Sequence, residues 1–247
     1  RCSGVKGVLS VAAPTFQCRR CEGNIPHANT DDDGGLTVDG ETYGQVESFC
    51  YLGDVLDASG GVDSAVRARV RCGWNKFHEL VPFLTSKAPT PQMKGLVYSA
   101  CVRSSMTYGA ETWALRADHE RMLERAENRM VRWMNGVSLK DRLTSKELQE
   151  NLQIENITEV VRRARLRWFG HVERKNDEDW VKRTTLLEIE GSRPAGRPKK
   201  TWHETVKADL RRLRLDSSEA SDREAWRRAI YAAGSNPGAP GRRTINR

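Results

Sequence analysis

Apolar side chains recur at helical spacing along most of the chain beyond residue 60, which predicts a mainly α-helical protein. The stripe is clear after Asp63, where every third or fourth residue is apolar as far as Leu84. It recurs after Pro91 and over Asp118 to Asn135, and Trp180 to Glu190 is expected to form a helix or a long turn. Shorter helices are expected in LTSKELQENL (143–152) and after Asn156, Thr201 and Ser221.

Capping residues support these helix starts. Thr90 followed by Pro91 is typical of a helix N-cap and first turn. Asp63 is also expected to act as a cap. Capping boxes, in which Ser, Thr or Asn is followed three residues later by Glu, are expected at four places. They are Thr144 with Glu147, Asn156 with Glu159, Thr201 with Glu204, and Ser221 with Glu224.

A small β element is expected before the first helix. Leu36–Val38 and Glu41–Tyr43 flank Asp39-Gly40, a dipeptide typical of a hairpin turn. The segment from Val46 to Leu56 is apolar and aromatic, and predicts a strand with a turn at Gly53-Asp54. The expected fold is therefore a helical bundle preceded by a small β-hairpin element.

One helix carries a cluster of arginines, RRARLRWFGHVERK at 162–175. Its apolar positions Ile157, Val161, Ala164, Trp168 and Val172 share one helical face. Four arginines are then expected to point sideways and outward, where they could bind phosphates: Arg162, Arg163, Arg165 and Arg167. The alternative is the solvated face of a core helix.

The charge distribution places further expected nucleic-acid contacts late in the chain. The formal net charge is +8, and residues 22–65 contain no lysine or arginine. GSRPAGRPKK (191–200) is a basic linker by composition, and its Gly196-Arg197-Pro198 resembles an AT-hook core. Trp168, Trp180 and Trp202 are expected to be core residues, with base stacking as the alternative. The late basic residues expected to bind nucleic acid are Arg174, Lys175, Arg193, Arg197, Lys199 and Lys200.

The cysteines give one candidate metal site. Cys18 and Cys21 form a Cys-x2-Cys pair, half of a tetrahedral zinc site, and Cys2 is a candidate third ligand. Zinc is therefore expected only at an incomplete site, and a frayed N-terminus is the alternative. The single cysteines Cys50, Cys72 and Cys101 are expected to be small buried hydrophobic residues in a reducing compartment.

No apolar run is long enough for a membrane span, and no secretory signal is present, so the expected location is nuclear or cytoplasmic. The first residue is Arg, which suggests a fragment of a longer protein.

Five blocks in order resemble the C-terminal third of non-LTR, LINE-type retrotransposon reverse transcriptases. They are SFCYLGDVL, RVRCGWNKFHELVPFL, VYSACVRSSMTYGAETWAL, RLRWFGHVERK and GRPKKTW, and they extend over about residues 36–215. The resemblance implies that Phe49, Tyr51, Leu52 and Gly53 belong to a primer grip. It also implies that the helices from residue 63 form a thumb over a template–primer duplex. Cys2, Cys18 and Cys21 match the tail of a PHD-like finger whose upstream ligands are missing.

The catalytic part of such a polymerase is not found in this sequence. The resemblance places its paired aspartates upstream, and no Tyr/Phe-x-Asp-Asp motif occurs here. The acidic run Asp31 to Asp33 is expected to be a solvated turn. Because nucleotidyl transfer needs carboxylates to hold Mg²⁺, no catalytic residue is expected. The chain alone should be inactive, with Mg²⁺ and polymerisation requiring a missing upstream core.

These observations divide the chain into five expected segments. They are a Cys-rich remnant at 1–30, the β element at 31–62, a thumb-like domain at 63–176, a basic helical extension at 177–233 and a disordered tail at 234–247. The expected function is nucleic-acid binding, to RNA, DNA or a template–primer duplex, as part of a retroelement RNA-directed DNA polymerase. The alternatives are a non-enzymatic nucleic-acid-binding protein derived from a retroelement, and a helical scaffold for an acidic protein.

Overall fold

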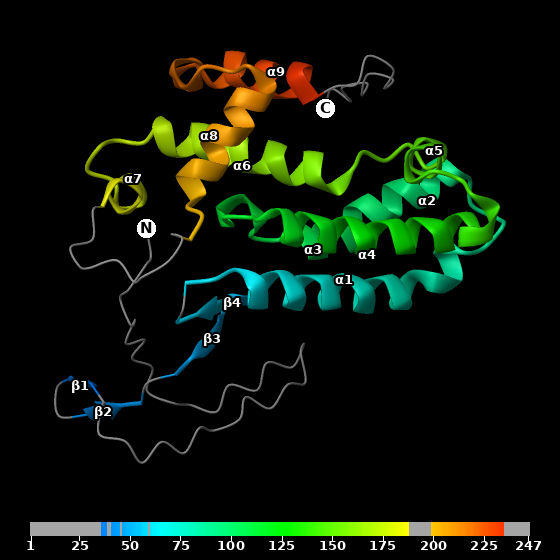
Figure 1. Ribbon diagram of the computed structural model, residues 1–247, viewed down its shortest axis with the longest axis horizontal. Helices are drawn as coiled ribbons and strands as arrows, with labels where there is room; N and C mark the ends of the chain where they lie inside the picture. The colour runs from blue at the N-terminus through cyan, green and yellow to red at the C-terminus, as the bar shows by residue number, and fades with distance from the viewer. Residues whose placement is uncertain (1–35, 39–40, 45, 59, 188–198, 235–247) are drawn as a thin grey trace, which may run out of the picture.

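Two short antiparallel hairpins precede the helices in the computed structural model, which describes residues 36–234 except 39–40, 45, 59 and 188–198 (Figure 1). Strand β1 (Leu36–Val38) pairs with β2 (Glu41–Tyr43), as the sequence predicts. Strand β3 (Ser48–Tyr51) pairs with β4 (Asp54–Asp57). The second turn lies at Leu52-Gly53, with φ of +48° and +80°. Both central residues are left-handed, as in type I′ hairpin turns. The predicted turn at Gly53-Asp54 is therefore displaced by one residue.

Helices make up most of the described residues, which confirms the mainly α prediction. The longest are α1 (Asp63–Leu84), α4 (Ala117–Asn135) and α6 (Ile157–Glu173). Between α1 and α4 the chain forms α2 (Pro91–Val97), a π-helical segment η1 (Tyr98–Arg103) and α3 (Ser104–Thr107) without a break. The remaining helices are α5 (Ser145–Asn151), α7 (Trp180–Leu186), α8 (Trp202–Leu213) and α9 (Arg223–Gly234), with short 3₁₀ turns η2 (Ala110–Thr112), η3 (Leu139–Asp141) and η4 (Ser217–Ser221).

Most of the predicted caps are present. Thr90 caps α2, and the boxes at Thr144 and Thr201 form with their glutamates. Three of the predicted caps were wrong in detail, because a carboxylate binds another partner or the helix begins at another residue. Asn156 caps α6 without Glu159, which instead binds Arg162 and Arg212. The cap of α9 is Asp222, not Ser221, and Asp63 is the first residue of α1 rather than its cap.

Two hydrophobic clusters hold the helices together, and α6 contributes to both. The larger cluster contains Phe77 of α1, Met130 of α4 and Val161 of α6. The smaller cluster contains Leu166 and Phe169 of α6 together with residues of α8, η4 and α9. Helices α1, α4 and α6 lie side by side, with α8 and α9 against α6 (Figure 1). The five-segment division remains a prediction.

A buried polar network crosses the larger cluster. The Arg103 guanidinium lies 2.7 Å from the Glu127 carboxylate, which also accepts from the backbone N–H of Ile157 at 2.9 Å. Tyr98 and Gln149 donate to the same carboxylate. Burial raises the pKa of Glu127 and raises that of Tyr98 well above its ordinary value. The network ties the π-helical segment to α4, α5 and the start of α6.

Candidate nucleic-acid interface

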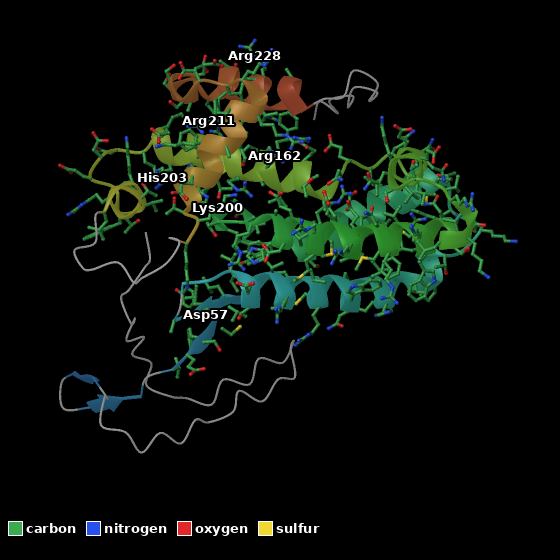
Figure 2. The ribbon with its side chains drawn as sticks, viewed as in Figure 1. Asp57, Arg162, Lys200, His203, Arg211 and Arg228 are labelled. Carbon is green, nitrogen blue, oxygen red and sulfur yellow. The ribbon has the colours of Figure 1, made fainter. Side chains whose placement is uncertain are left out.

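Two of the four α6 arginines are directed into the protein. Arg162 and Arg165 are 5% and 1% exposed. Both bind Asp209 of α8, with N–O distances of 3.1 and 2.6 Å. The prediction that they point outward is therefore wrong. Arg162 is labelled in Figure 2, on α6 where α8 crosses it.

The error follows from the position of α6 between two cores. Its buried face includes Leu166 and Phe169, whereas Ala164 and Trp168 are only half-buried. Burial lowers the pKa of Arg165, although Asp209 opposes this shift. Burial also acts to lower the pKa of Arg162, but its bonds to Glu159 and Asp209 raise it overall.

The other two α6 arginines differ from each other. Arg163 forms a two-pronged salt bridge with Glu155, with both N–O distances 2.9 Å, and lies over the ring of Tyr231. Arg167 is exposed. Of the predicted row, Arg167 alone is exposed, so α6 does not carry a continuous cationic surface.

The late basic residues are mostly used within the fold or lie outside the described residues. Arg174 donates to the Ala220 carbonyl at 2.7 Å, and Lys175 pairs with Asp179 at 2.7 Å. Lys200 is exposed, and its ammonium donates to the Leu115 carbonyl at 2.8 Å. Lys199 is also exposed. Arg193, Arg197 and the Gly-Arg-Pro motif lie outside the described residues.

The tryptophan prediction is partly wrong. Trp180 is 73% exposed, with the Arg183 guanidinium 4.8 Å from its ring centre. Trp168 and Trp202 are half-buried, and the Trp202 indole N–H donates to the Glu111 carbonyl at 2.8 Å. Since α7 is short and lies at the edge of the fold (Figure 1), its tryptophan stays in solvent.

A different surface gathers arginines and aromatic rings, on adjacent faces of α1 and α4. We call it the basic–aromatic face. On α1 it comprises Arg67, Arg71, Trp74 and His78, and on α4 it comprises Arg121, Arg125, Arg129 and Trp133.

Ring and side-chain contacts fix the two halves of this face together. The Arg129 guanidinium lies 5.7 Å from the centre of the Trp74 ring. Trp133 lies 5.9 Å from His78, and Trp133 is 44% exposed. Nearer the helix starts, the His119 imidazole lies 3.0 Å from Asp63. The start of α1 thus contacts the start of α4, and the later part of α1 contacts the later part of α4. The two helices therefore run in the same direction.

The arginines of this face are free to bind an external anion. All five are exposed, and within the described part of the chain none has a carboxylate at ion-pairing distance. Two acidic side chains of these helices bind other cations, since Glu79 binds Lys76 and Asp118 binds Arg116. Unpaired guanidiniums on rigid helices suit phosphate recognition, because each offers two parallel N–H donors.

A pattern in the sequence indicates this surface, although it was not among the predictions made from the sequence. Arg121, Arg125 and Arg129 recur every four residues, opposite the buried stripe that contains Leu123 and Met130. That arrangement predicts an outward arginine row.

The primer-grip-like residues lie at the tip of the β3–β4 hairpin. Tyr51 and Leu52 are 56% and 74% exposed, and Phe49 is half-buried with its ring 6.4 Å from that of Tyr51. Arg69 of α1 donates to the Gly53 carbonyl, and the Trp113 indole N–H donates to Asp54 at 3.2 Å. These bonds fix the tip of the hairpin against the helices.

One group of side chains has the spacing of a metal site, but a guanidinium occupies it. Ligand atoms of Asp63, Asp118 and His119 lie within 4.8 Å of one another. Arg116 reaches into the group, 2.9 Å from Asp63 and 3.2 Å from the His119 ring nitrogen. The arginine supplies the positive charge there, so we interpret the group as a clamp between α1 and α4.

The predicted zinc ligands Cys2, Cys18 and Cys21 lie outside the described residues. The single cysteines are less buried than predicted, because Cys50 and Cys72 are half-buried and Cys101 is exposed. Cys101 lies on the outer side of η1, whose inner side holds Tyr98 and Val102.

Comparison with known proteins finds weak similarity to a transposon-derived protein. The chain is 22% identical over 196 residues to an uncharacterised transposon-derived protein of Caenorhabditis elegans, an alignment covering 73% of this chain and 69% of that protein. No protein-family model matches the chain, and no solved structure does. The similarity supports a transposon origin. Among the described helices we find none with the length and hydrophobicity that a bilayer span requires.

Proposed function

We propose that the chain binds nucleic acid through the basic–aromatic face, as the thumb and C-terminal part of a retroelement reverse transcriptase. The observation that carries the proposal is the set of five exposed arginines on two parallel helices, without carboxylate partners in the described residues. Phosphate contacts of this kind supply affinity without reading sequence.

The dimensions of the face suit a duplex. Arg121 and Arg129 are eight residues apart, and at 1.5 Å per residue their Cα atoms are about 12 Å apart. Arg67 and Arg71 provide a second row on the neighbouring helix. Two rows can contact phosphates on both sides of a groove, whereas a single row follows one strand.

The resemblance to LINE-type reverse transcriptases gives this binding a role. The β3–β4 hairpin precedes α1 directly and presents Tyr51 and Leu52 at its tip, in keeping with a primer grip beside a thumb. The transposon-derived relative supports a transposon origin, which is compatible with this role. The polymerase aspartates and their Mg²⁺ would belong to a separate core, so this chain would hold the template–primer and not extend it.

The test removes three charges from α4 and compares the loss with an equal change elsewhere. The R121Q/R125Q/R129Q variant should bind a 20-base-pair duplex about tenfold to hundredfold more weakly at 0.15 M salt, since each lost phosphate contact lowers affinity. The matched control is R223Q/R227Q/R228Q on α9, where the three arginines are also exposed. Fluorescence anisotropy measures both affinities.

Two results would count against the proposal. Equal losses in the two variants would mean that net charge, rather than the basic–aromatic face, determines binding. Absence of duplex and RNA–DNA hybrid binding by the native chain would favour the scaffold alternative, in which the arginines meet an acidic protein.

A further inference from the structure

A second cationic surface lies along α8, where the helix meets the η4 turn. Two adjoining hollows of about 420 and 390 Å³ open there. They share Lys207, Leu210 and Ser217, so they adjoin, and we treat them together as one shallow groove. Arg211 and His203, labelled on α8 in Figure 2, line its two ends.

The rim of the groove is basic. Lys207, Arg211 and Arg214 lie at positions i, i+4 and i+7, and all three are exposed. In the described part of the chain, none of them has a carboxylate at ion-pairing distance. Their Cα atoms extend over about 10 Å along the helix. Three free cations in a row suit successive phosphates of one strand.

Two carboxylates also line the groove. Asp216 accepts from the backbone N–H of Ser218 at 3.0 Å, and this bond lowers its pKa, so it stays ionised at neutral pH. That carboxylate is therefore engaged in capping η4. Glu173 is exposed at the other end. The three cations outnumber these two carboxylates.

The floor of the groove is apolar. Val206, Leu210 and Phe169 line it from below and are buried in the smaller cluster. His203 lies beside them, and burial together with Lys207 lowers its pKa, which favours the neutral imidazole. An apolar floor beneath a cationic rim suits a ligand that carries both phosphates and uncovered aromatic bases.

We propose that this groove binds single-stranded nucleic acid, separately from duplex binding at the basic–aromatic face. Unpaired bases can contact the floor while the phosphates meet Lys207, Arg211 and Arg214. A duplex keeps its bases stacked inside, so it could use the rim and not the floor. The groove shares no residue with the basic–aromatic face, and its argument stands without the proposed thumb role.

The experiment compares two probes on three variants of the full chain: the α4 variant R121Q/R125Q/R129Q, a variant of α8 and a variant of α9. The probes are a fluorescent 20-nucleotide oligothymidine and a 20-base-pair duplex. K207Q/R211Q/R214Q should weaken oligothymidine binding at least about tenfold and duplex binding less than about threefold. The α9 variant R223Q/R227Q/R228Q has the same charge change, and should leave oligothymidine affinity within about threefold of the native value.

Each outcome bears on one proposal. Oligothymidine affinity that is unchanged in the α8 variant, or equally reduced in the α8 and α9 variants, overturns the groove proposal. Absence of oligothymidine binding by the native chain overturns it as well. Failure of the α4 variant to alter duplex binding affects the proposed function alone. Thermal melting verifies that all three variants are folded.

Discussion

Helices α4 and α6 each carry several arginines at close spacing, yet they use them in opposite ways. On α6, Arg162 and Arg165 are buried against Asp209. On α4, Arg121 and Arg125 are exposed and have no carboxylate partner among the described residues. The local sequence is strongly basic in both helices. What differs is whether another element packs over the arginine-bearing side.

A residue that is distant in the sequence determines whether the α6 arginines are buried or exposed. Asp209 lies 47 and 44 residues away from its two partners along the chain. Once α8 places this carboxylate beside α6, both guanidiniums pair with it and are buried, and Glu159 supplies a second partner to Arg162. Arg162 and Arg165 therefore hold α6 and α8 together, whereas Arg121, Arg125 and Arg129 of α4 are available for a partner.

Removal of the shared carboxylate of Asp209 should destabilise the protein strongly. Asp209→Ala leaves the buried Arg165 guanidinium without its anion and leaves Arg162 with Glu159 alone. Breaking a buried pair in this way typically destabilises by about 3–5 kcal/mol. Urea unfolding should show a loss of this size. Asp177→Asn is the control, because Asp177 is 86% exposed and binds Lys182 in solvent, so its loss should stay below about 1 kcal/mol.

A small loss of stability in Asp209→Ala would show that Arg162 and Arg165 can reach solvent. In that event α6 could still present a cationic surface, and the contrast with α4 would be removed.

A second prediction concerns the part of α6 that packs under α9. A Cβ added at Gly170 would lie 2.3 Å from the Trp226 indole nitrogen, which donates to the Leu166 carbonyl at 2.9 Å. Gly170→Ala should therefore destabilise by about 1–3 kcal/mol through overpacking. Thermal melting measures this. A more stable variant would mean that helix propensity, worth about 1 kcal/mol in favour of Ala, outweighs the contact with Trp226.

The sequence predicted the helices well because their signals are local. The capping residues Thr90, Thr144 and Thr201 and the apolar stripe of α1 determine helix starts and faces within a few residues. The type I′ turn at Leu52 was missed by one residue, since a leucine with positive φ is rare and only strand pairing determines it.

The candidate site could be predicted only in part. The sequence indicated an arginine-rich surface, but the direction of Arg162 and Arg165 depends on Asp209 of α8. Trp180 is exposed in the structure, whereas the sequence predicted a core position. The direction and exposure of these side chains depend on how the helices pack against one another. The spacing of residues along one helix does not specify that packing. By contrast, the spacing of Arg121, Arg125 and Arg129 does predict that these arginines point outward.

The smallest expected effect is a pH dependence at the clamp between α1 and α4. A hydrogen bond with His119 lowers the pKa of Asp63 below its ordinary value of 3.8. The ionised carboxylate therefore stabilises the fold above about pH 4, and this contribution is lost as the pH falls through the lowered value. Asp63→Asn should narrow the difference in melting temperature between pH 6 and pH 3. An unchanged difference would show that Asp63 does not contribute to acid sensitivity.

The salt dependence of duplex affinity tests the contrast between α4 and α6 most directly. The slope of log affinity against log salt changes by about 0.9 for each phosphate contact with B-form DNA. We expect R121Q/R125Q/R129Q to reduce the magnitude of this slope by about 2–3, and R163Q/R167Q on α6 to change it by less than about 1. An unchanged slope in the α4 variant, or a larger reduction in the α6 variant, would contradict the assignment of the nucleic-acid surface to α1 and α4.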